Sequence, residues 1–542
     1  MSQRNTNKTG EAALLINAEI LSMDDDRTIA NAMIYQDGLI RFVGDESDAR
    51  RWLSRRGCSV REIDGEGCCV LPGFIDTHLH SIMLSIFEIN ADLGEVSSIE
   101  EVVRILSGKA ASLEPGEWLL GLQLDEQRFS ETGLPDRHVL DRICADNPLV
   151  IFCRDGHSLT ANSAALRDAG IADAPQEIEG GTIEVDAENV PTGVCREAAV
   201  GIVMKRFKPP GEAQLMTATR EAICKLAAHG ITSIGAILQT DEEGPGGASG
   251  RRESLMMAAL APDLPLSIYN IFIGSNPSGI SQLEADRRTE PFADIKYRAF
   301  KIFSDGTLGS CTACMHQGFF DHPEKTGYLT LSLDELYRRM RDAHLMGLQV
   351  CIHAIGDKAV TTCIDLYEKL LGAHPRAGHR HRIEHASVVS PRDIPRLAQL
   401  GLVLSCQPLF IRSEAKWLPQ RLGPQRLPMT YPFRSFFESG IVIAGSSDAP
   451  IESTSVLAAI ECCVTRDGFT PEQVLTVDQA ISMYTRNAAF IQFEELEKGT
   501  LEPGKRADFV MLDENPHRVV PRDIGKIGLV RTVRGGEVTF ER

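Results

Sequence analysis

Two histidines separated by one residue, His78 and His80, end the apolar run of "VLPGFIDTHLHS" at residues 70–81. Side chains two positions apart on a β-strand lie on the same face, so both imidazoles can reach one point. A neutral imidazole is a good ligand for zinc and related divalent cations. The spacing therefore predicts a metal site at the end of this strand.

Four further residues stand at the ends of other short apolar runs. They are Lys301 in "FKIFSDG", His353 in "CIHAIGD", His385 in "HRIEHA" and Asp448 in "GSSDAP". A second H-x-H pair, His379 and His381, precedes its run instead, and we expect it to face solvent. Histidines placed by accident have no reason to end separate strands, so this placement strengthens the metal prediction.

Lys301 is the unusual member of the set, because a protonated amine is repelled by divalent cations. A desolvated lysine held near positive charge has a lowered pKa. Its free amine can take up carbon dioxide to become a carbamate, which is a carboxylate on a long stem. Such a group could bridge two metal ions.

The elements that would position these residues form a repeating pattern between residues 72 and 494. Helix signals, such as Ser332 with Glu335 three residues later and Gly347 after the last turn, alternate with continuously apolar runs typical of parallel strands. The eight runs are "VLPGFIDTHLH", "GITSIGAI", "LSIYNIF", "YRAFKIF", "GLQVCIHA", "HRIEHA", "GLVLSC" and "GIVIAGSSD". Eight strands close a (β/α)8 TIM barrel, whose functional residues lie at the carboxyl ends of the strands.

The rest of the chain divides around that barrel. Residues 72–91 carry the first strand, 92–210 are predicted to be an inserted α+β segment, and 211–494 complete the barrel. Residues 1–71 and 495–542 show short strands and tight turns, with Asp37-Gly38 and Gly535-Gly536 as hairpin signals. Each tail is too small to fold alone, so we expect both to form one discontinuous β-sandwich domain. The predicted fold is an α/β distorted barrel with these two additions.

Composition excludes several classes of function. The 56 basic and 75 acidic residues give a net charge of −19, which disfavours nucleic acid and anionic membranes as partners. The polar N-terminus does not resemble a secretory signal, no apolar run is long enough to span a membrane, and 14 scattered cysteines fit a reduced compartment. We therefore expect a cytoplasmic protein. Cys311 and Cys314 form a lone C-x-x-C without the second pair that a zinc ribbon needs.

The motifs "LPGFIDTHLH", "FKIFSDGTLGS", "CIHAIGD", "HRIEHA", "GSSDAP" and "KGTLEPGKRADFVMLD" resemble the amidohydrolase superfamily. Within it, they are similar to the branch of N-substituted formamide deformylases and exoenzyme-regulator-like proteins. The likeness runs from about residue 12 to 515. It implies a metal-dependent hydrolase with a barrel, a small β domain and an inserted domain.

The resemblance also implies a role for each candidate. His78 and His80 would bind a buried first metal ion, His353 and His385 a second, and carboxylated Lys301 would bridge them. Asp448 would bind the first ion and carry a proton. The ions, most commonly zinc but also manganese, iron or cobalt, would activate water to cleave a non-peptide carbon–nitrogen bond of a small amide, N-formyl or cyclic amide substrate.

A stretch of the inserted segment, "DGHSLTANSAALRDAGI", is also similar to the branch, which implies that His157 and Asn162 line the substrate pocket. Other positions depart from the family pattern. Thr160 stands where a Trp is usual, Phe410 where a His is frequent and Cys311 where an Arg is frequent, while "GLQLDE" lacks nearby aromatics. These changes spare the metal positions and leave the substrate open. We expect Asp305 in "SDG" to be a turn residue rather than a catalyst.

Two alternatives remain open from the sequence. A mononuclear deaminase of an aminated heterocycle would use the same histidines and Asp448, but it would need a Glu after the strand carrying His353, where this chain has "HAIGDKAV". A non-catalytic scaffold on the same fold would have lost ligands, and none of the six is missing. A homodimer is expected by analogy with the superfamily.

Overall fold

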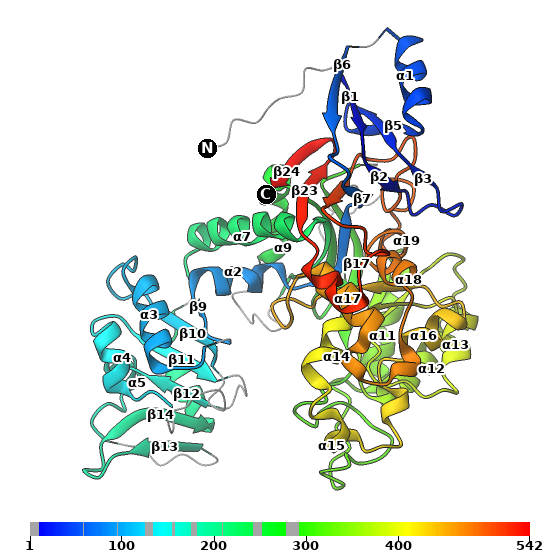
Figure 1. Cartoon of the computed structure of the whole chain (residues 1–542). Helices are drawn as coiled ribbons and strands as arrows, with labels where there is room; N and C mark the ends of the chain where they lie inside the picture. The colour runs from blue at the N-terminus through cyan, green and yellow to red at the C-terminus, as the bar shows by residue number, and fades with distance from the viewer. Residues whose placement is uncertain are drawn as a thin grey trace. The chain divides into compact units, whose positions relative to one another are not determined.

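The structure is a computed structural model that describes residues 10–57, 59–94, 96–124, 134–153, 158–174, 181–208, 210–241, 252–277 and 292–542. The chain divides into two compact units. Unit 1 contains residues 1–81 and 223–542, and unit 2 contains residues 82–222 (Figure 1). Each unit is described separately. No helix among the described residues combines the length and apolar character that a membrane crossing requires.

An eight-stranded parallel sheet in unit 1 forms the predicted barrel, with strand order β8-β15-β16-β17-β18-β19-β20-β21. The strands are β8 (Phe74–Leu79), β15 (Ile231–Gln239), β16 (Ser267–Ile273), β17 (Ile295–Phe303), β18 (Gln349–Ala354), β19 (Arg382–His385), β20 (Val403–Cys406) and β21 (Ile443–Gly445). The two outer strands are joined where Thr77 Oγ1 donates to Gly445 O at 3.0 Å and Asp448 N to His78 O at 2.8 Å. All eight predicted runs are strands of this distorted barrel.

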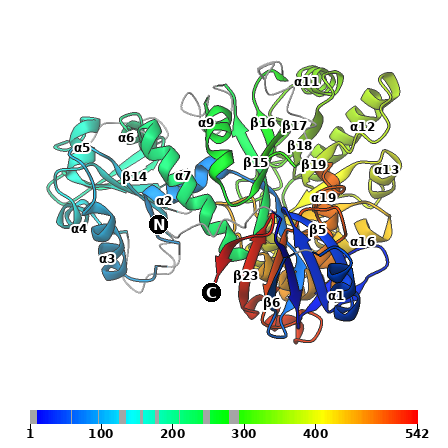
Figure 2. The same ribbon diagram turned by 90° about the horizontal axis from the view of Figure 1, so that it is seen from above.

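Helices follow most of these strands, and Figure 2 shows α11, α12 and α13 on the outer side of β16–β19. The helices of unit 1 are α1 (Glu46–Ser54), α9 (Glu253–Leu260), α11 (Leu333–Leu345), α12 (Asp357–Ala373), α13 (Ile394–Gln399), α14 (Pro408–Glu414), α15 (Leu418–Leu422), α16 (Phe433–Glu438), α17 (Val456–Thr465), α18 (Val477–Met483) and α19 (Arg486–Ile491). Helix α11 begins as predicted, because the Ser332 side chain accepts a hydrogen bond from Glu335 N.

Strands from both ends of the chain form the β-sandwich of unit 1. One sheet has the order β5-β4-β1-β6 and the other the order β24-β23-β22-β7-β2-β3. The strands are β1 (Ala12–Ile16), β2 (Glu19–Leu21), β3 (Ile29–Ala30), β4 (Ala32–Gln36), β5 (Leu39–Gly44), β6 (Val60–Asp64), β7 (Cys69–Pro72), β22 (Phe509–Leu512), β23 (Leu529–Arg534) and β24 (Glu537–Glu541). Val70 pairs with Met511, and one core contains Leu15, Val70 and Phe509. The sandwich is therefore discontinuous, as predicted (Figure 1).

Unit 2 has a six-stranded mixed sheet of order β13-β14-β12-β11-β10-β9. Its elements are α2 (Ser81–Ile89), β9 (Ala91–Asp92), α3 (Ile99–Ala110), β10 (Leu119–Leu124), α4 (Arg137–Ile143), β11 (Leu149–Cys153), β12 (Ser158–Ala161), α5 (Ser163–Ala169), β13 (Gly181–Val185), β14 (Pro191–Glu197) and α6 (Ala198–Met204), while α7 (Glu212–Leu226) runs into unit 1. The inserted segment predicted at 92–210 lies within this unit. Its strand-like pieces are β10 and β11.

The expectation that His379 and His381 face solvent is wrong. Their exposed fractions are 7% and 0%. Val350 N donates to His381 Nδ1 at 3.0 Å, so the neutral ring carries its proton on Nε2, which lies 2.8 Å from His344 Nδ1. His381 N in turn donates to His379 Nδ1 at 2.9 Å. The pair is buried because both rings satisfy backbone groups where β18 and β19 begin.

This cluster predicts a pH-dependent stability. Burial, followed by the charges of neighbouring histidines and Arg376, lowers the pKa of His381 well below its ordinary value, and burial also lowers the pKa values of His344 and His379. The unfolded chain therefore binds more protons below about pH 6.5. The stabilisation is complete above that pH and is lost as the pH falls, by up to about 1.4 kcal/mol per pH unit for each histidine. Urea unfolding between pH 5 and 8 measures the slope.

The variant His381→Gln separates this cluster from other histidines. Its stability should depend less steeply on pH below 6.5 than that of the wild type, because one titrating group is gone. Equal slopes for the two proteins would show that the buried cluster does not control the acid sensitivity.

Candidate metal centre

The six predicted site residues come from the carboxyl ends of five barrel strands. His78 lies in β8 and His80 directly follows it, Lys301 is in β17, His353 in β18, His385 in β19, and Asp448 follows β21. The structure brings all six together in the barrel of unit 1. Five are buried and His80 is partly buried. This position matches the rule that functional residues of such barrels collect at one end.

Asp448 is the centre of the group. Its Oδ1 atom lies 3.3 Å from Nε2 of His78 and 3.3 Å from Nε2 of His80. Ligand atoms of these three residues all lie within 4.8 Å of one another. Among the described residues, Oδ1 is buried and has no hydrogen-bond partner. A buried carboxylate oxygen without a donor, facing two imidazole nitrogens, fits a divalent cation.

The electrostatics of Asp448 agree with that fit. Burial alone would raise the pKa of this carboxyl, but the neighbouring His78, His80 and His385 lower it well below its usual value. The group is therefore ionised, as a metal ligand must be. Its backbone φ of 56° and that of His385, 73°, lie in the left-handed region. Such strain in non-glycine residues is typical of functional sites.

Lys301 is 2% exposed, and its Nζ lies 2.8 Å from Nε2 of His78. Burial lowers the pKa of this amine, although Asp448 and Glu384 oppose the effect. The Phe303 ring lies beside it, with its centroid 4.9 Å from Nζ. The amine thus reaches the nitrogen of His78 that faces Asp448.

The remaining two histidines lie side by side, with ring centroids 4.6 Å apart. His385 Nδ1 hydrogen-bonds Gln407 Oε1 at 2.8 Å, and His353 Nε2 hydrogen-bonds Gly306 O at 3.1 Å. These hydrogen bonds engage Nδ1 of His385 and Nε2 of His353, so the other ring nitrogens, Nε2 of His385 and Nδ1 of His353, are the ones that could bind a metal ion. Burial and the nearby Lys301 lower the pKa of His353 to about 3, so the ring is neutral.

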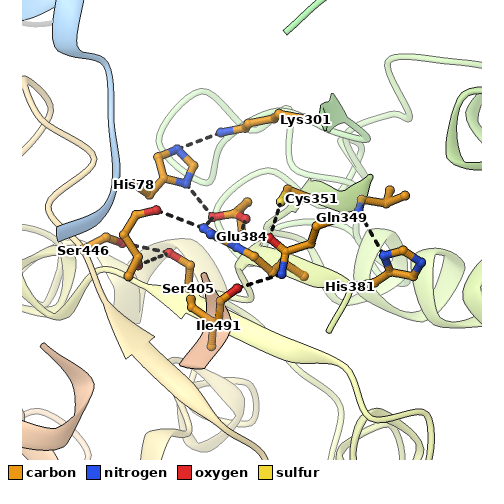
Figure 3. Close-up of polar contacts among 12 residues, drawn as sticks. His78, Lys301, Gln349, Cys351, His381, Glu384, Ser405, Ser446 and Ile491 are labelled. Atoms are coloured by element: carbon orange, nitrogen blue, oxygen red, sulfur yellow. Dashed lines mark hydrogen bonds and ion pairs between the residues drawn. The ribbon is translucent and has the colours of Figure 1, made fainter. Parts of the chain in front are cut away.

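Glu384 contacts a predicted metal ligand, and although the strand motif "HRIEHA" contains it, sequence reasoning did not single it out. Its Oε2 lies 2.6 Å from Nδ1 of His78 (Figure 3). The Arg382 guanidinium forms an ion pair with the same carboxylate. Burial alone would raise the pKa of this carboxyl, but Arg382 and His78 lower it well below its usual value. The sequence did contain a signal, because Arg382 and Glu384 are charged residues separated by one position in an otherwise apolar strand. Both side chains therefore lie on the same face of the strand and must pair inside the barrel.

The two predicted substrate contacts lie in unit 2. His157 falls outside the described residues. Asn162 is fully buried and caps α5, where its side-chain oxygen accepts from Ala165 N and Leu149 N. Its amide nitrogen donates to Cys144 O and Asn147 O. All four hydrogen-bonding positions are therefore taken within unit 2, and the structure gives Asn162 a structural role.

Asp305 ties two loops together. Its carboxylate accepts hydrogen bonds from Ile355 N at 3.1 Å, Gly356 N at 2.9 Å and Cys314 N at 2.8 Å. Burial raises its pKa to about 7. These three backbone contacts fit the expected structural residue, because they join the loop after β17 to the loop after β18. The contact of 3.5 Å to His353 Nε2 also helps to hold that ring.

Two of the residues that depart from the family pattern lie in unit 1. The Phe410 ring stacks on His385, with centroids 6.2 Å apart and an interplanar angle of 7°. Cys311 lies near Asp321 and His322, with ligand atoms within 4.8 Å, and both Cys311 and Cys314 are free thiols. The stacked Phe410 ring therefore places an apolar surface against His385.

Comparison with known proteins gives a family match and full-length relatives. A profile of the amidohydrolase family matches residues 61–540. The putative amidohydrolase YtcJ of Bacillus subtilis is 29% identical over 531 residues, covering 96% of this chain and 97% of that protein. The N-substituted formamide deformylase of Arthrobacter pascens is 26% identical over 548 residues, covering 98% of each.

Solved structures show the same architecture. An uncharacterized metal-dependent hydrolase from Pyrococcus furiosus aligns with a TM-score of 0.75 and 26% identity, covering 93% of this chain and 99% of that one. Atrazine chlorohydrolase from Arthrobacter aurescens, solved with zinc, aligns with a TM-score of 0.55 over 98% of this chain and 95% of its own. Its identity of 16% supports the fold alone.

Proposed function

We propose a function from one premise, which is that this chain belongs to the amidohydrolase family. The protein is a metal-dependent hydrolase that cleaves a non-peptide carbon–nitrogen bond of a small amide, N-formyl amine or cyclic amide. The observation that carries the proposal is Asp448 Oδ1, which is buried, without a hydrogen-bond donor among the described residues, and 3.3 Å from two imidazole nitrogens. The deformylase relative supports the choice of bond.

The residues divide into two sets of ligands. His78, His80 and Asp448 would hold a first divalent ion, and His353 with His385 would hold a second, with zinc as the expected metal. When bound, the ions supply an activated water and polarise the substrate carbonyl. The chain's own groups then orient the substrate and move protons.

Asp448 carries out the proton transfers. Its carboxylate accepts the proton that the attacking water loses and delivers it to the leaving nitrogen, so the products are an acid and an amine. Phe303 lies beside His353, and Phe410 stacks on His385. Both aromatic rings would keep water away from the two histidines that hold the second ion.

Lys301 completes the centre as a carbamate. Its neutral amine nitrogen would form a bond to the carbon of carbon dioxide as one carbon–oxygen π bond opens, and the released proton would pass to water, leaving a carboxylate that could help to hold the ions. Burial and the 2.8 Å approach to His78 Nε2 support this role. Mass measurement of the native protein tests it, because the carbamate adds the mass of carbon dioxide and Lys301→Ala removes that addition.

A substrate panel tests the reaction. N-formyl amines, N-acyl amides, cyclic imides and aminated heterocycles should be assayed for the release of amine or ammonia. Amine from the amides is the expected result. Ammonia from the ring amines alone would instead identify a deaminase, and no turnover by protein with full metal content would favour the scaffold alternative.

Metal removal gives a direct prediction. Dialysis against a chelator should abolish turnover, and added zinc or cobalt should restore it, because Asp448 and the histidines then regain their ion. Elemental analysis alongside the assay measures ions per chain. Full turnover at substoichiometric metal would contradict the proposal.

A further inference from the structure

A row of three charged or polar side chains crosses the barrel interior below the metal centre. Arg382, Glu384 and His78 are each 0% exposed. Figure 3 shows Lys301, His78 and Glu384 joined in sequence by dashed contacts. A buried carboxylate is costly unless it is paired and hydrogen-bonded, so this row needs an explanation.

The contacts of His78 determine its protonation. An ionised carboxylate only accepts hydrogen bonds, so the 2.6 Å contact with Glu384 Oε2 requires the proton of His78 on Nδ1. The lone pair is then on Nε2, which lies 3.3 Å from Asp448 Oδ1. Glu384 thus selects the nitrogen that faces the other ligands.

Arg382 holds Glu384 in place on the opposite side. Its Nη2 donates to Glu384 Oε2 at 2.8 Å, and its Nε lies 2.8 Å from Oε1. The same Nη2 donates to Thr77 O at 3.1 Å, directly before His78 in β8. The guanidinium therefore fixes both the carboxylate and the backbone that carries the ligand.

The other histidines have weaker acceptors. His385 Nδ1 contacts the neutral amide of Gln407. His353 Nε2 hydrogen-bonds a backbone carbonyl at 3.1 Å, and the nearest carboxylate oxygen, Asp305 Oδ1, is farther away at 3.5 Å. A charged acceptor increases the donor strength of the opposite imidazole nitrogen more than a neutral one does. His78 should therefore be the strongest imidazole ligand of these three.

We propose that Glu384, held by Arg382, is a positioning residue that makes the site of His78, His80 and Asp448 the tighter of the two metal sites. The inference rests on the proposed function and deepens it. It explains why the barrel interior buries a carboxylate between the His78 imidazole and the Arg382 guanidinium. It also predicts the order in which the two ions bind.

The test is the isosteric variant Glu384→Gln, studied by titrating metal-free protein with cobalt. The dissociation constant of the first cobalt ion should be about 10- to 100-fold higher in this variant than in the wild-type protein. The visible spectrum of the first bound cobalt ion should also change, because the donor strength of His78 falls. The conservative Glu384→Asp should recover part of the affinity.

Two further variants make the result decisive. Glu494→Gln removes another buried carboxylate, which pairs with Lys296 and Lys498, and it should leave the cobalt affinity unchanged. Gln407→Glu places a charge on His385 instead and should tighten the second ion by about 10-fold. It serves as the test even if Glu384→Gln does not fold.

The outcomes separate the two proposals. Wild-type protein that binds no cobalt would overturn the proposed function itself. Wild-type protein that binds cobalt, with Glu384→Gln matching it in affinity and spectrum, would overturn the role of Glu384 alone. If Gln407→Glu left the dissociation constant of the second cobalt ion unchanged, that result would also overturn the role of Glu384.

Discussion

Asp448→Asn is expected to lower kcat on the amide substrate by about 10²- to 10⁴-fold, the range for loss of a general acid–base group. The amide keeps the size of the side chain but cannot accept the proton of the attacking water. It also weakens a metal ligand, since Asp448 Oδ1 lies 3.3 Å from two imidazole nitrogens. Steady-state kinetics together with metal content measure both losses.

Asp393→Asn is the matched control. Asp393 is equally buried, but its carboxylate contacts Thr361 and Arg396 on the helices outside the barrel. That variant should lose stability and keep its kcat. If Asp448→Asn with full metal retained the wild-type kcat, Asp448 could not be the group that moves the proton.

The strand ends could be predicted because one physical rule connects them. Parallel strands buried on both faces read as continuous apolar runs, and their carboxyl ends meet at one end of the barrel. His353 and His385, far apart in the chain, could therefore be placed together from the sequence.

The directions of individual side chains in and near β19 could not be predicted from the sequence. Glu384 and His385 are neighbours and would alternate faces in a regular strand, yet His385 has a φ of 73° that re-aims its ring. A single sequence contains no signal for that backbone change. The burial of His379 and His381 was missed for a related reason, because their partners, Val350 N and His344, come from other elements.

The inserted segment shows a different limit. The similarity of "DGHSLTANSAALRDAGI" to the family predicted that Asn162 contacts the substrate. In the structure, the Asn162 amide caps α5 and hydrogen-bonds the backbone of Leu149, Cys144 and Asn147. An Asn before a helix is a cap more often than a ligand contact. The structure adds what the sequence could not show, which is that all the hydrogen-bonding positions of this amide are occupied within unit 2.

A buried ion-pair cluster stabilises the amino end of the barrel, opposite to the candidate metal centre. Glu494 is 2% exposed and lies 3.2 Å from Lys296 Nζ and 2.7 Å from Lys498 Nζ. Lys498 Nζ also donates to Ser233 Oγ and Ser267 Oγ, near the starts of β15 and β16. The group thus joins the segment after α19 to the amino ends of three strands, where residues serve stability rather than catalysis.

Glu494→Gln is expected to lower the free energy of unfolding by about 3–5 kcal/mol, because it leaves the buried Lys498 ammonium without its carboxylate partner, while Lys296 keeps its ion pair with Glu497. Urea unfolding at pH 7.5 measures the change. Glu438→Gln is the control, because Glu438 pairs with Arg434 on an exposed helix face, where the loss should be about 0.5 kcal/mol or less. Equal losses in the two variants would mean that the Lys498 ammonium finds another partner, and that the Glu494 carboxylate does not hold the barrel's amino end together.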